Sequence, residues 1–195
     1  MPTNDLISAT ASAEEDPDIN CEEPTSAEVA IAITWLKNGK APGVCGITAD
    51  MLKAGGTCSV EWLTKVCQNA WRSDTVPPDW KEGVIIPIYK GKGSRKECQN
   101  YRGITLLSVP GKVLAAVLLN RVKTKLLQAR RREQSGFTPG RSTTERIFTL
   151  NTLIHTSKEF NQPLWIAYVD LKSTFDSVDR ESLWLLFRDK VYLCR

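Results

Sequence analysis

The sequence lacks lysine and arginine in its first 36 residues, contains one histidine, and has no run approaching the roughly 18 apolar residues that a membrane helix needs. Because the first 36 residues carry no cation, we expect neither a secretory signal peptide nor an Arg-rich transit peptide. The six cysteines form no C-x-x-C pair, and the single His155 cannot complete a Cys/His zinc cluster. We therefore expect reduced thiols in an intracellular protein of the nucleus or cytoplasm that is neither secreted nor bound to a membrane.

Charge is divided unevenly along the chain. Residues 1–30 hold eight Asp/Glu and no Lys/Arg, whereas residues 81–146 hold 15 Lys/Arg against 4 Asp/Glu, within a net charge of +4. A basic block of this size predicts a polyanionic partner such as nucleic acid. The alternative is a solvated basic surface without a partner, and composition alone does not decide between the two.

Hydrophobic patterning predicts an acidic disordered tail over residues 1–24 and one α+β domain over residues 25–195. A Thr25/Glu28 capping box opens the first helix. Two runs, 83–90 and 101–107, predict a β-hairpin with a basic tip, in which Pro87 confines its strand to an edge. Further helices are predicted over residues 49–53, 60–71, 110–127, 142–160 and 179–187, with a buried strand over 164–169.

Carboxylates follow the last predicted strand. A strand that ends in Asp170 is unusual, because a carboxylate near a core is costly unless it is paired or bound to a metal. Asp170, Asp176 and Asp179 offer the hard oxygen ligands that Mg²⁺ prefers. For Asp179, a helix N-cap is the better interpretation.

Four blocks follow one another in order. The first is Asn38-Gly-Lys-Ala-Pro-Gly43 with Gly46-Ile47. The second runs from Pro78-Asp-Trp80 through Ile88-Tyr-Lys90 to Asn100-Tyr-Arg102-Gly-Ile104, with Leu106-Leu107. The third is Gln134-Ser-Gly-Phe137 with Gly140-Arg-Ser-Thr143, and the fourth is an apolar strand, Asp170, four residues, Phe175 and Asp176. These blocks resemble the fingers blocks and first palm motif of reverse transcriptases, most of all those of non-LTR (LINE-type) retrotransposons, over residues 25–190.

The resemblance implies a role for each matching residue. Asp170 matches the first catalytic metal ligand, which binds Mg²⁺ in the full-length enzyme. Phe175 matches the aromatic gate beneath the nucleotide sugar, with core packing as the alternative, and the backbone after Leu171 is placed to meet phosphate oxygens. Lys90 and Arg102 match positions that contact the triphosphate, with a solvated hairpin as the alternative. Basic residues expected to bind nucleic acid are Arg130, Arg131, Arg132 and Arg141.

The resemblance also implies an RNA-directed DNA polymerase with an RNA template, a DNA primer and dNTPs as partners. The fold it implies is right-hand polymerase fingers with an incomplete palm sheet. The pattern departs at Cys45, where Asp is usual, at Gly103, where Pro is usual, and at Ser173-Thr174 and Glu145. No Asp-Asp pair follows Asp170, so we expect this chain to be inactive by itself. Two alternatives stay open: a non-catalytic nucleic-acid-binding remnant, and a small Mg²⁺-dependent hydrolase using the three aspartates.

Overall fold

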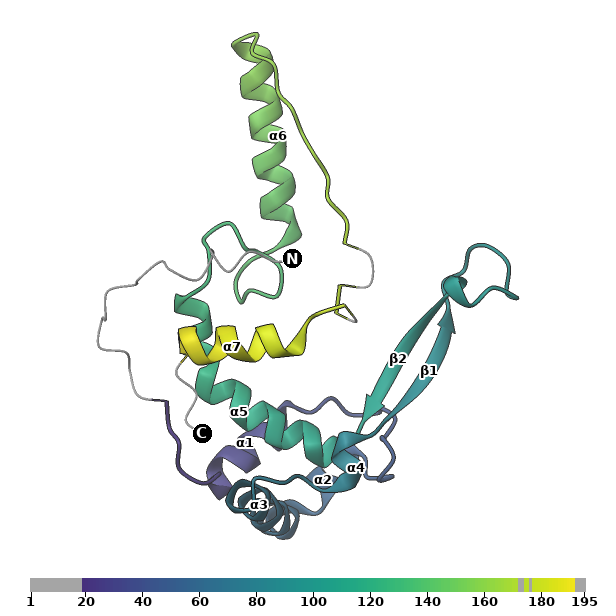
Figure 1. Ribbon diagram of the computed structural model, residues 1–195, viewed down its shortest axis with the longest axis vertical. Coiled ribbons are helices and arrows are strands. Elements are labelled where there is room, and N and C mark those ends of the chain that lie inside the picture. The colour runs from purple at the N-terminus through teal and green to yellow at the C-terminus, as the bar shows by residue number, and fades with distance from the viewer. Residues whose placement is uncertain (1–18, 172–173, 176, 192–195) are drawn as a thin grey trace.

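The computed structural model describes residues 19–171, 174–175 and 177–191. A series of helices is interrupted by one β-hairpin, which lies between α4 and α5, as Figure 1 shows. The helices are α1 (Ser26–Trp35), α2 (Ala49–Ala54), α3 (Gly56–Arg72), α4 (Pro78–Lys81), α5 (Val109–Gln128), α6 (Thr143–Glu159) and α7 (Arg180–Val191). The strands are β1 (Gly83–Tyr89) and β2 (Tyr101–Leu107), joined through a 3₁₀ turn, η2 (Cys98–Asn100). The predicted mixture of helix and strand is confirmed.

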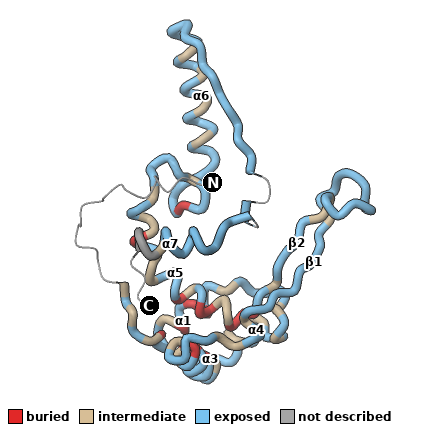
Figure 2. Tube along the Cα trace, in the orientation of Figure 1, coloured by how far each residue is buried: buried red, intermediate tan, exposed pale blue. Residues whose placement is uncertain are grey.

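One hydrophobic core lies between α1, α3 and α5, at the base of the molecule in Figures 1 and 2. Each helix presents apolar residues at helical spacing, so that one face of it is buried. The core residues are Val29, Ala32 and Ile33 from α1, Leu63, Cys67 and Ala70 from α3, and Val113, Leu114 and Val117 from α5. The predicted capping box is confirmed: Glu28 N–H donates to Thr25 Oγ1 at 3.2 Å, and Thr25 N–H donates to Glu28 Oε2 at 2.9 Å.

The predicted hairpin is also confirmed. β1 and β2 pair antiparallel from Gly83↔Leu107 to Tyr89↔Tyr101. Pro87, which has no N–H to donate, lies opposite Gly103 in this two-stranded sheet. The hairpin projects from the helical base in Figure 1, and its apolar side chains stay exposed, with Ile85 at 67%. It is therefore an arm rather than part of the core.

The predicted buried strand over 164–169 is wrong. Residues 162–171 have no regular secondary structure, and the exposed fractions of Trp165 and Val169 are 92% and 84%. A strand requires a neighbour for its backbone N–H and C=O groups, and no segment among the described residues pairs with this one. The apolar pattern therefore indicates a segment that could form a strand, but the described residues contain no partner strand for it to pair with.

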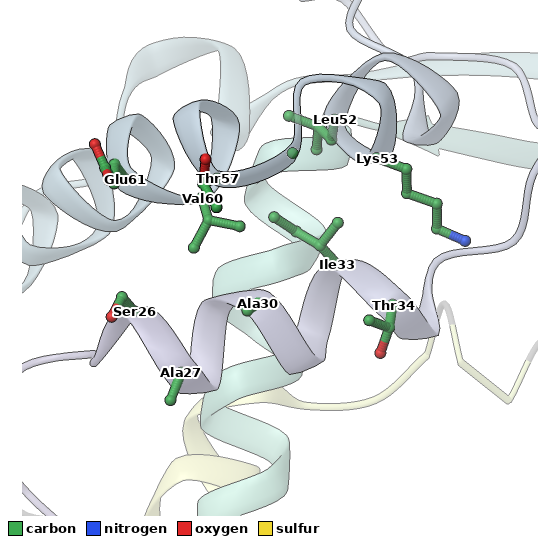
Figure 3. A pocket seen from close by; sticks show the side chains of 11 residues that line it. Ser26, Ala27, Ala30, Ile33, Thr34, Leu52, Lys53, Thr57, Val60 and Glu61 are labelled. Atoms are coloured by element: carbon green, nitrogen blue, oxygen red, sulfur yellow. The ribbon is translucent and has the colours of Figure 1, made fainter.

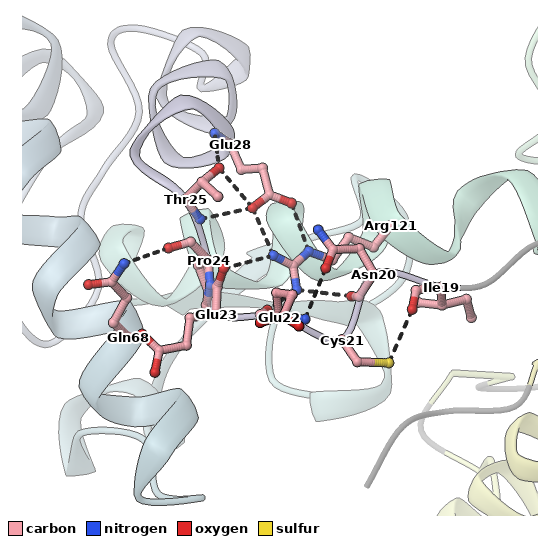
Figure 4. A network of polar contacts seen from close by, with 10 residues as sticks. All are labelled: Ile19, Asn20, Cys21, Glu22, Glu23, Pro24, Thr25, Glu28, Gln68 and Arg121. Carbon is pink, nitrogen blue, oxygen red and sulfur yellow. Dashed lines mark hydrogen bonds and ion pairs between the residues drawn. The ribbon is translucent and has the colours of Figure 1, made fainter.

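Residues 20–24, assigned to the tail from the sequence, lie against the helices. Arg121 Nη1 donates to the carbonyl oxygens of Asn20 and Glu22 at 3.1 and 2.6 Å, and Gln68 Nε2 donates to that of Pro24 at 3.0 Å. Figure 4 shows the first two contacts meeting at Arg121, with the contact between Gln68 and Pro24 beside them. The packed part of the chain therefore begins before the predicted boundary at residue 25, while residues 1–18 lie outside the described residues.

The thiols differ in state. Cys45, Cys58, Cys67 and Cys98 are free, as predicted, whereas Cys21 is disulfide-bonded, so the expectation of reduced thiols is wrong for that residue. Across the part of the chain that the structure describes, no helix combines the length and the hydropathy that crossing a membrane requires.

Candidate nucleotide and nucleic-acid site

The loop of the first block packs against the junction of β2 and α5. A Cβ atom on Gly43 would lie 2.5 Å from the carbonyl carbon of Leu107 and 2.6 Å from the amide nitrogen of Ser108, so only glycine fits there. Cys45 Sγ lies 3.3 Å from Ser108 Oγ. The first and second sequence blocks therefore form one unit, which the spacing of the motifs did not reveal.

Cys45 occupies the position where the family pattern has Asp. Burial raises the pKa of the Cys45 thiol, but hydrogen bonds from the Ser108 hydroxyl and from the backbone of Ile47 and Val109 lower it by more, so the net pKa is below its usual range. Val109 is the first residue of α5, whose N-terminus favours negative charge. The site is thus suited to an anionic side chain such as the missing aspartate.

Lys90 and Arg102 both lie on the hairpin. Lys90 is exposed, and its Nζ donates to the carbonyl oxygen of Gln99 at 2.6 Å while its N–H donates to that of Asn100 at 2.8 Å. Arg102 is exposed on β2 opposite Ile88. The two cations are therefore carried by one element, with Lys90 held at the end of the arm.

The third block forms a loop fixed by Arg146. Arg146 Nε donates to Ser135 Oγ at 2.8 Å, and Nη2 donates to the carbonyl oxygen of Glu133 at 2.7 Å. The loop presents Phe137, which has a φ of 56° and a 96% exposed side chain. A left-handed conformation is costly for a bulky residue and marks a position held by its surroundings.

Phe137 meets Phe175 of the palm-like motif. The two ring centroids lie 6.0 Å apart at an interplanar angle of 83°, an edge-to-face arrangement. Phe175 is otherwise 81% exposed, so the alternative of simple core packing does not describe it. The structure thus brings the third and fourth blocks together, a contact that the sequence analysis did not predict.

Asp170 is exposed on the irregular segment that precedes this contact. Leu171, next to it, is 65% exposed, and its carbonyl oxygen accepts from Thr174 Oγ1 at 2.8 Å. Residues 172, 173 and 176 lie outside the described residues. Within the described ranges, no group of three His, Cys, Asp or Glu side chains could hold a metal ion. Asp170 therefore offers one oxygen ligand of the kind Mg²⁺ prefers, but not a complete site.

Asp179 is confirmed as a helix cap. Its Oδ1 accepts from Glu181 N–H at 3.1 Å, and its Oδ2 accepts from Ser182 Oγ at 2.6 Å. These bonds, chiefly that from Ser182, lower the pKa of the Asp179 carboxyl. Both carboxylate oxygens of Asp179 are therefore engaged at the start of α7.

The two halves of the candidate site stand apart. In Figure 1 the hairpin and the irregular segment that follows α6 are separate, and no hydrogen bond or ion pair among the described residues joins Lys90 or Arg102 to Asp170 or Phe175. The structure therefore places the nucleotide-binding candidates in two groups.

The basic residues are less available than their number suggests. Arg121, with its side chain 5% exposed, forms an ion pair with Glu28, and Lys125 is 7% exposed. Arg141 Nη1 lies 3.3 Å from Glu145 Oε1. Arg131 and Arg132 are exposed, whereas Arg130 is half-buried, with Nε and Nη1 buried and lacking hydrogen-bond partners among the described residues. Charge counted from the sequence thus overstates the basic surface.

A cavity of about 750 Å³ lies between α1, α2 and α3, shown in Figure 3. It is lined by residues such as Ala30, Ile33 and Val60, with Lys53 and Glu61 among its polar members. None of the candidate site residues lines it. Lys53 Nζ donates to the carbonyl oxygen of Leu36 at 2.6 Å, so this cation is used within the fold. The cavity is therefore separate from the candidate site.

Comparison with known proteins matches residues 89–188 to the family described as reverse transcriptase (RNA-dependent DNA polymerase). The chain belongs to this family. It is 33% identical over 153 residues to a putative 115 kDa protein of the type-1 retrotransposable element R1DM of Drosophila melanogaster, covering 78% of the chain and 15% of that protein. It is 29% identical over 154 residues to a probable RNA-directed DNA polymerase from transposon X-element of the same species, covering 77% of the chain and 17% of the relative.

A third relative, from Xenopus laevis, is the uncharacterized 149 kDa protein of transposon TX1, at 25% identity over 156 residues, covering 80% of the chain and 12% of the relative. The resemblance to non-LTR retrotransposon reverse transcriptases is thereby confirmed. The chain spans less than a fifth of the length of these relatives.

Proposed function

We propose that this chain forms the fingers and the first palm segment of an RNA-directed DNA polymerase, which transfers nucleotides from dNTPs to a DNA primer on an RNA template. One observation carries the proposal: the family match over residues 89–188 spans the hairpin tip with β2, the third block and the palm-like motif together. The folded unit runs from residue 25 onward, with residues 20–24 packed against it. The edge-to-face contact of Phe137 with Phe175 supports a common site for the last two blocks.

Each group has a task that suits its chemistry. Lys90 and Arg102 neutralise the triphosphate, Arg102 through its planar fork of donors. The Phe175 ring lies beneath the sugar and excludes a 2′-hydroxyl by its size. The backbone following Leu171 faces phosphate oxygens. Arg130, Arg131, Arg132 and Arg141 contact the nucleic-acid backbone without reading bases.

Asp170 is proposed as one ligand of Mg²⁺. Reverse transcriptases generally use divalent metals, and the exposed carboxylate fits a hard cation. The described residues supply no group of three His, Cys, Asp or Glu side chains that could hold a metal ion, so a complete metal site requires ligands from outside them. We therefore propose that the chain alone does not extend primers.

A non-catalytic nucleic-acid-binding protein is the second candidate. It is favoured by the separation of the hairpin from Asp170 and by the absence of a metal-ligand cluster among the described residues. The hydrolase alternative has little support, because Asp179 caps α7 with both carboxylate oxygens.

A chimera separates the two candidates. The aligned segment of this chain replaces its counterpart in the probable RNA-directed DNA polymerase from transposon X-element, and extension of a DNA primer on an RNA template is measured. The polymerase proposal expects extension that falls when Lys90 and Arg102 are changed to Gln, chiefly through a raised KM for dNTP. A chimera that folds and binds template but does not extend the primer would favour the non-catalytic candidate.

A further inference from the structure

The turn between α1 and α2 contains the one Asn-Gly dipeptide of the sequence, Asn38-Gly39. Both residues are exposed, and Gly39 has a φ of 66° with open space where a side chain would stand. An asparagine before glycine loses ammonia when the following amide nitrogen attacks the side-chain carbonyl carbon, since glycine puts no Cβ in the way of that approach. The groups that contact these two residues therefore decide how fast the reaction runs.

A carboxylate contacts the attacking nitrogen. Gly39 N–H donates to Asp50 Oδ2 at 3.0 Å, and no backbone carbonyl oxygen of a described residue accepts from it. Asp50 lies in the first turn of α2, after the Thr48 N-cap, so the helix fixes its position. A carboxylate within hydrogen-bond reach of a proton has the geometry of a general base. Asp50 is therefore placed to take the proton that the Gly39 nitrogen must lose.

An ammonium group contacts the oxygen on which negative charge develops. Lys53 Nζ donates to Asn38 Oδ1 at 2.7 Å and to the carbonyl oxygen of Leu36 at 2.6 Å. Figure 3 shows the Lys53 side chain extending from α2 toward the end of α1. A cation at this place polarises the Asn38 side-chain carbonyl and stabilises the oxyanion that forms on attack. The contact with Leu36 holds the ammonium group in position.

We propose that Asn38-Gly39 is a site of self-modification, at which Asp50 and Lys53 promote closure of a succinimide ring in the folded chain. The Gly39 nitrogen passes its proton to Asp50 and bonds to Asn38 Cγ, whose C=O electron pair moves to Oδ1 beside Lys53. When the carbonyl re-forms, the bond from Cγ to the side-chain nitrogen breaks, and that nitrogen takes the proton from Asp50 and leaves as ammonia. Water then hydrolyses one of the two ring C–N bonds, with its hydroxyl going to carbon and its proton to nitrogen, and leaves aspartate or isoaspartate at position 38.

The product changes the charge of the first sequence block. A carboxylate replaces a neutral amide two residues before the exposed Lys40. Because Lys53 Nζ already contacts Asn38 Oδ1, an ion pair takes the place of the present hydrogen bond. The isoaspartate form also lengthens the backbone of the turn by one methylene. The inference goes beyond the proposed polymerase function, since it needs only the contacts of this turn.

The test follows residue 38 in the purified full chain at neutral pH, by mass spectrometry of peptic peptides, which separates asparagine, succinimide, aspartate and isoaspartate. The same chain unfolded in guanidinium chloride keeps the dipeptide but removes it from Asp50 and Lys53. The folded chain should form the products faster than the unfolded chain. Faster formation in the unfolded chain would show that the two contacts protect Asn38, and would overturn the proposal.

Two variants remove the two groups separately. Asp50→Asn keeps an oxygen acceptor for the Gly39 N–H but removes the base, and should slow the loss of ammonia roughly ten- to a hundred-fold, since water partly replaces an exposed base. Lys53→Met keeps the aliphatic stem and should slow it roughly ten-fold, whereas Lys53→Arg, which keeps the charge, should retain most of the rate. The matched controls are Glu61→Gln and Lys37→Met, at exposed positions without a hydrogen bond or ion pair to the dipeptide among the described residues.

Circular dichroism melts verify that each variant folds, so that a slow reaction is not the result of unfolding. Unchanged rates in both Asp50→Asn and Lys53→Met would show that the dipeptide reacts as any exposed Asn-Gly does, and would overturn the assignment. Rates that fall as far in the two control variants would overturn it as well. Primer extension tests the proposed function separately, and neither result depends on the other.

Discussion

Arg121 and Glu28, 93 residues apart in the sequence, form a bidentate ion pair, with Nε 2.7 Å from Oε1 and Nη2 2.7 Å from Oε2. The Arg121 guanidinium also lies 5.4 Å from the centroid of the Trp71 ring, so α1, α3 and α5 meet at this one side chain. The hydrogen bond from Arg121 is the largest cause that lowers the pKa of Glu28, to about 2, against burial, which raises it. This ion pair holds the N-terminal turn of α1 against α5.

Glu28→Gln is expected to reduce the free energy of unfolding by ~2–3 kcal/mol, because it leaves a buried guanidinium without its carboxylate partner. Because folding lowers the pKa of Glu28, its contribution is fully present above about pH 4.5 and is lost as the pH falls toward 2. Urea unfolding at pH 7, 5, 4 and 3 should show that the difference in free energy of unfolding between wild type and variant becomes smaller as the pH falls. Glu61→Gln, at an exposed position, is the control. A difference that does not depend on pH would contradict the assignment.

Gly43→Ala should destabilise the fold by ~2 kcal/mol or more, because its Cβ would meet the backbone of Leu107 and Ser108 at 2.5–2.7 Å. Gly136→Ala is the control, since the nearest atom to a Cβ there is 3.5 Å away. Thermal melts of the two variants give the comparison. Equal stability of both would show that the first block does not pack on the β2–α5 junction.

Cys45→Asp is expected to preserve stability or raise it by up to ~1 kcal/mol, because a carboxylate gains from the Ser108 hydroxyl and from the N-terminus of α5. Cys45→Leu, which accepts no hydrogen bonds, should lower it. Thiol labelling provides a second check: the lowered pKa of Cys45 predicts reaction at lower pH than Cys67, whose pKa burial raises to about 11. Destabilisation by Asp exceeding that by Leu would contradict the anion-accepting role.

Hydrogen exchange should separate the two ends of the molecule. Amides of residues 164–171 should exchange fast, since none of them donates a backbone hydrogen bond to a described residue, whereas those in the core turns of α5 around Val113 and Val117 should be protected. The readout is mass spectrometry of peptic peptides over seconds to hours. Strong protection of both segments would mean that residues 164–171 have found a sheet partner.

Replacing Arg130, Arg131 and Arg132 by Ala should weaken nucleic-acid binding and lower the salt slope together, by up to about 2 on single strands. Wild-type dissociation constants should be no tighter than roughly micromolar near physiological salt, as expected without base readout. Because Arg130 has buried N–H groups, the pair Arg131→Ala with Arg132→Ala serves as the variant that leaves the fold undisturbed. Salt-independent binding would be incompatible with phosphate contacts.

Features set by neighbouring residues were predictable from the sequence. The Thr25/Glu28 capping box and the cap at Asp179 depend on side chains within a few residues of the backbone they bond. The hairpin bounds follow from two apolar runs that the hydrophilic turn between them joins. Contacts between distant residues were not predictable, among them Arg121 with Glu28 and Phe137 with Phe175, because no local pattern encodes them. The strand expected over 164–169 failed for the same reason: its hydrogen bonds belong to a partner that periodicity cannot supply.

The most direct test of the polymerase account compares two aspartates in the chimera with the X-element relative. Asp170→Asn removes the proposed metal ligand, and Asp179→Asn changes a cap whose oxygens are bonded within α7. Primer extension on an RNA template with Mg²⁺ should fall at least roughly 1,000-fold for Asp170→Asn, as for loss of a group that acts in the transition state, and by far less for Asp179→Asn. Equal, small effects of the two substitutions would show that Asp170 is not a catalytic ligand and contradict the account.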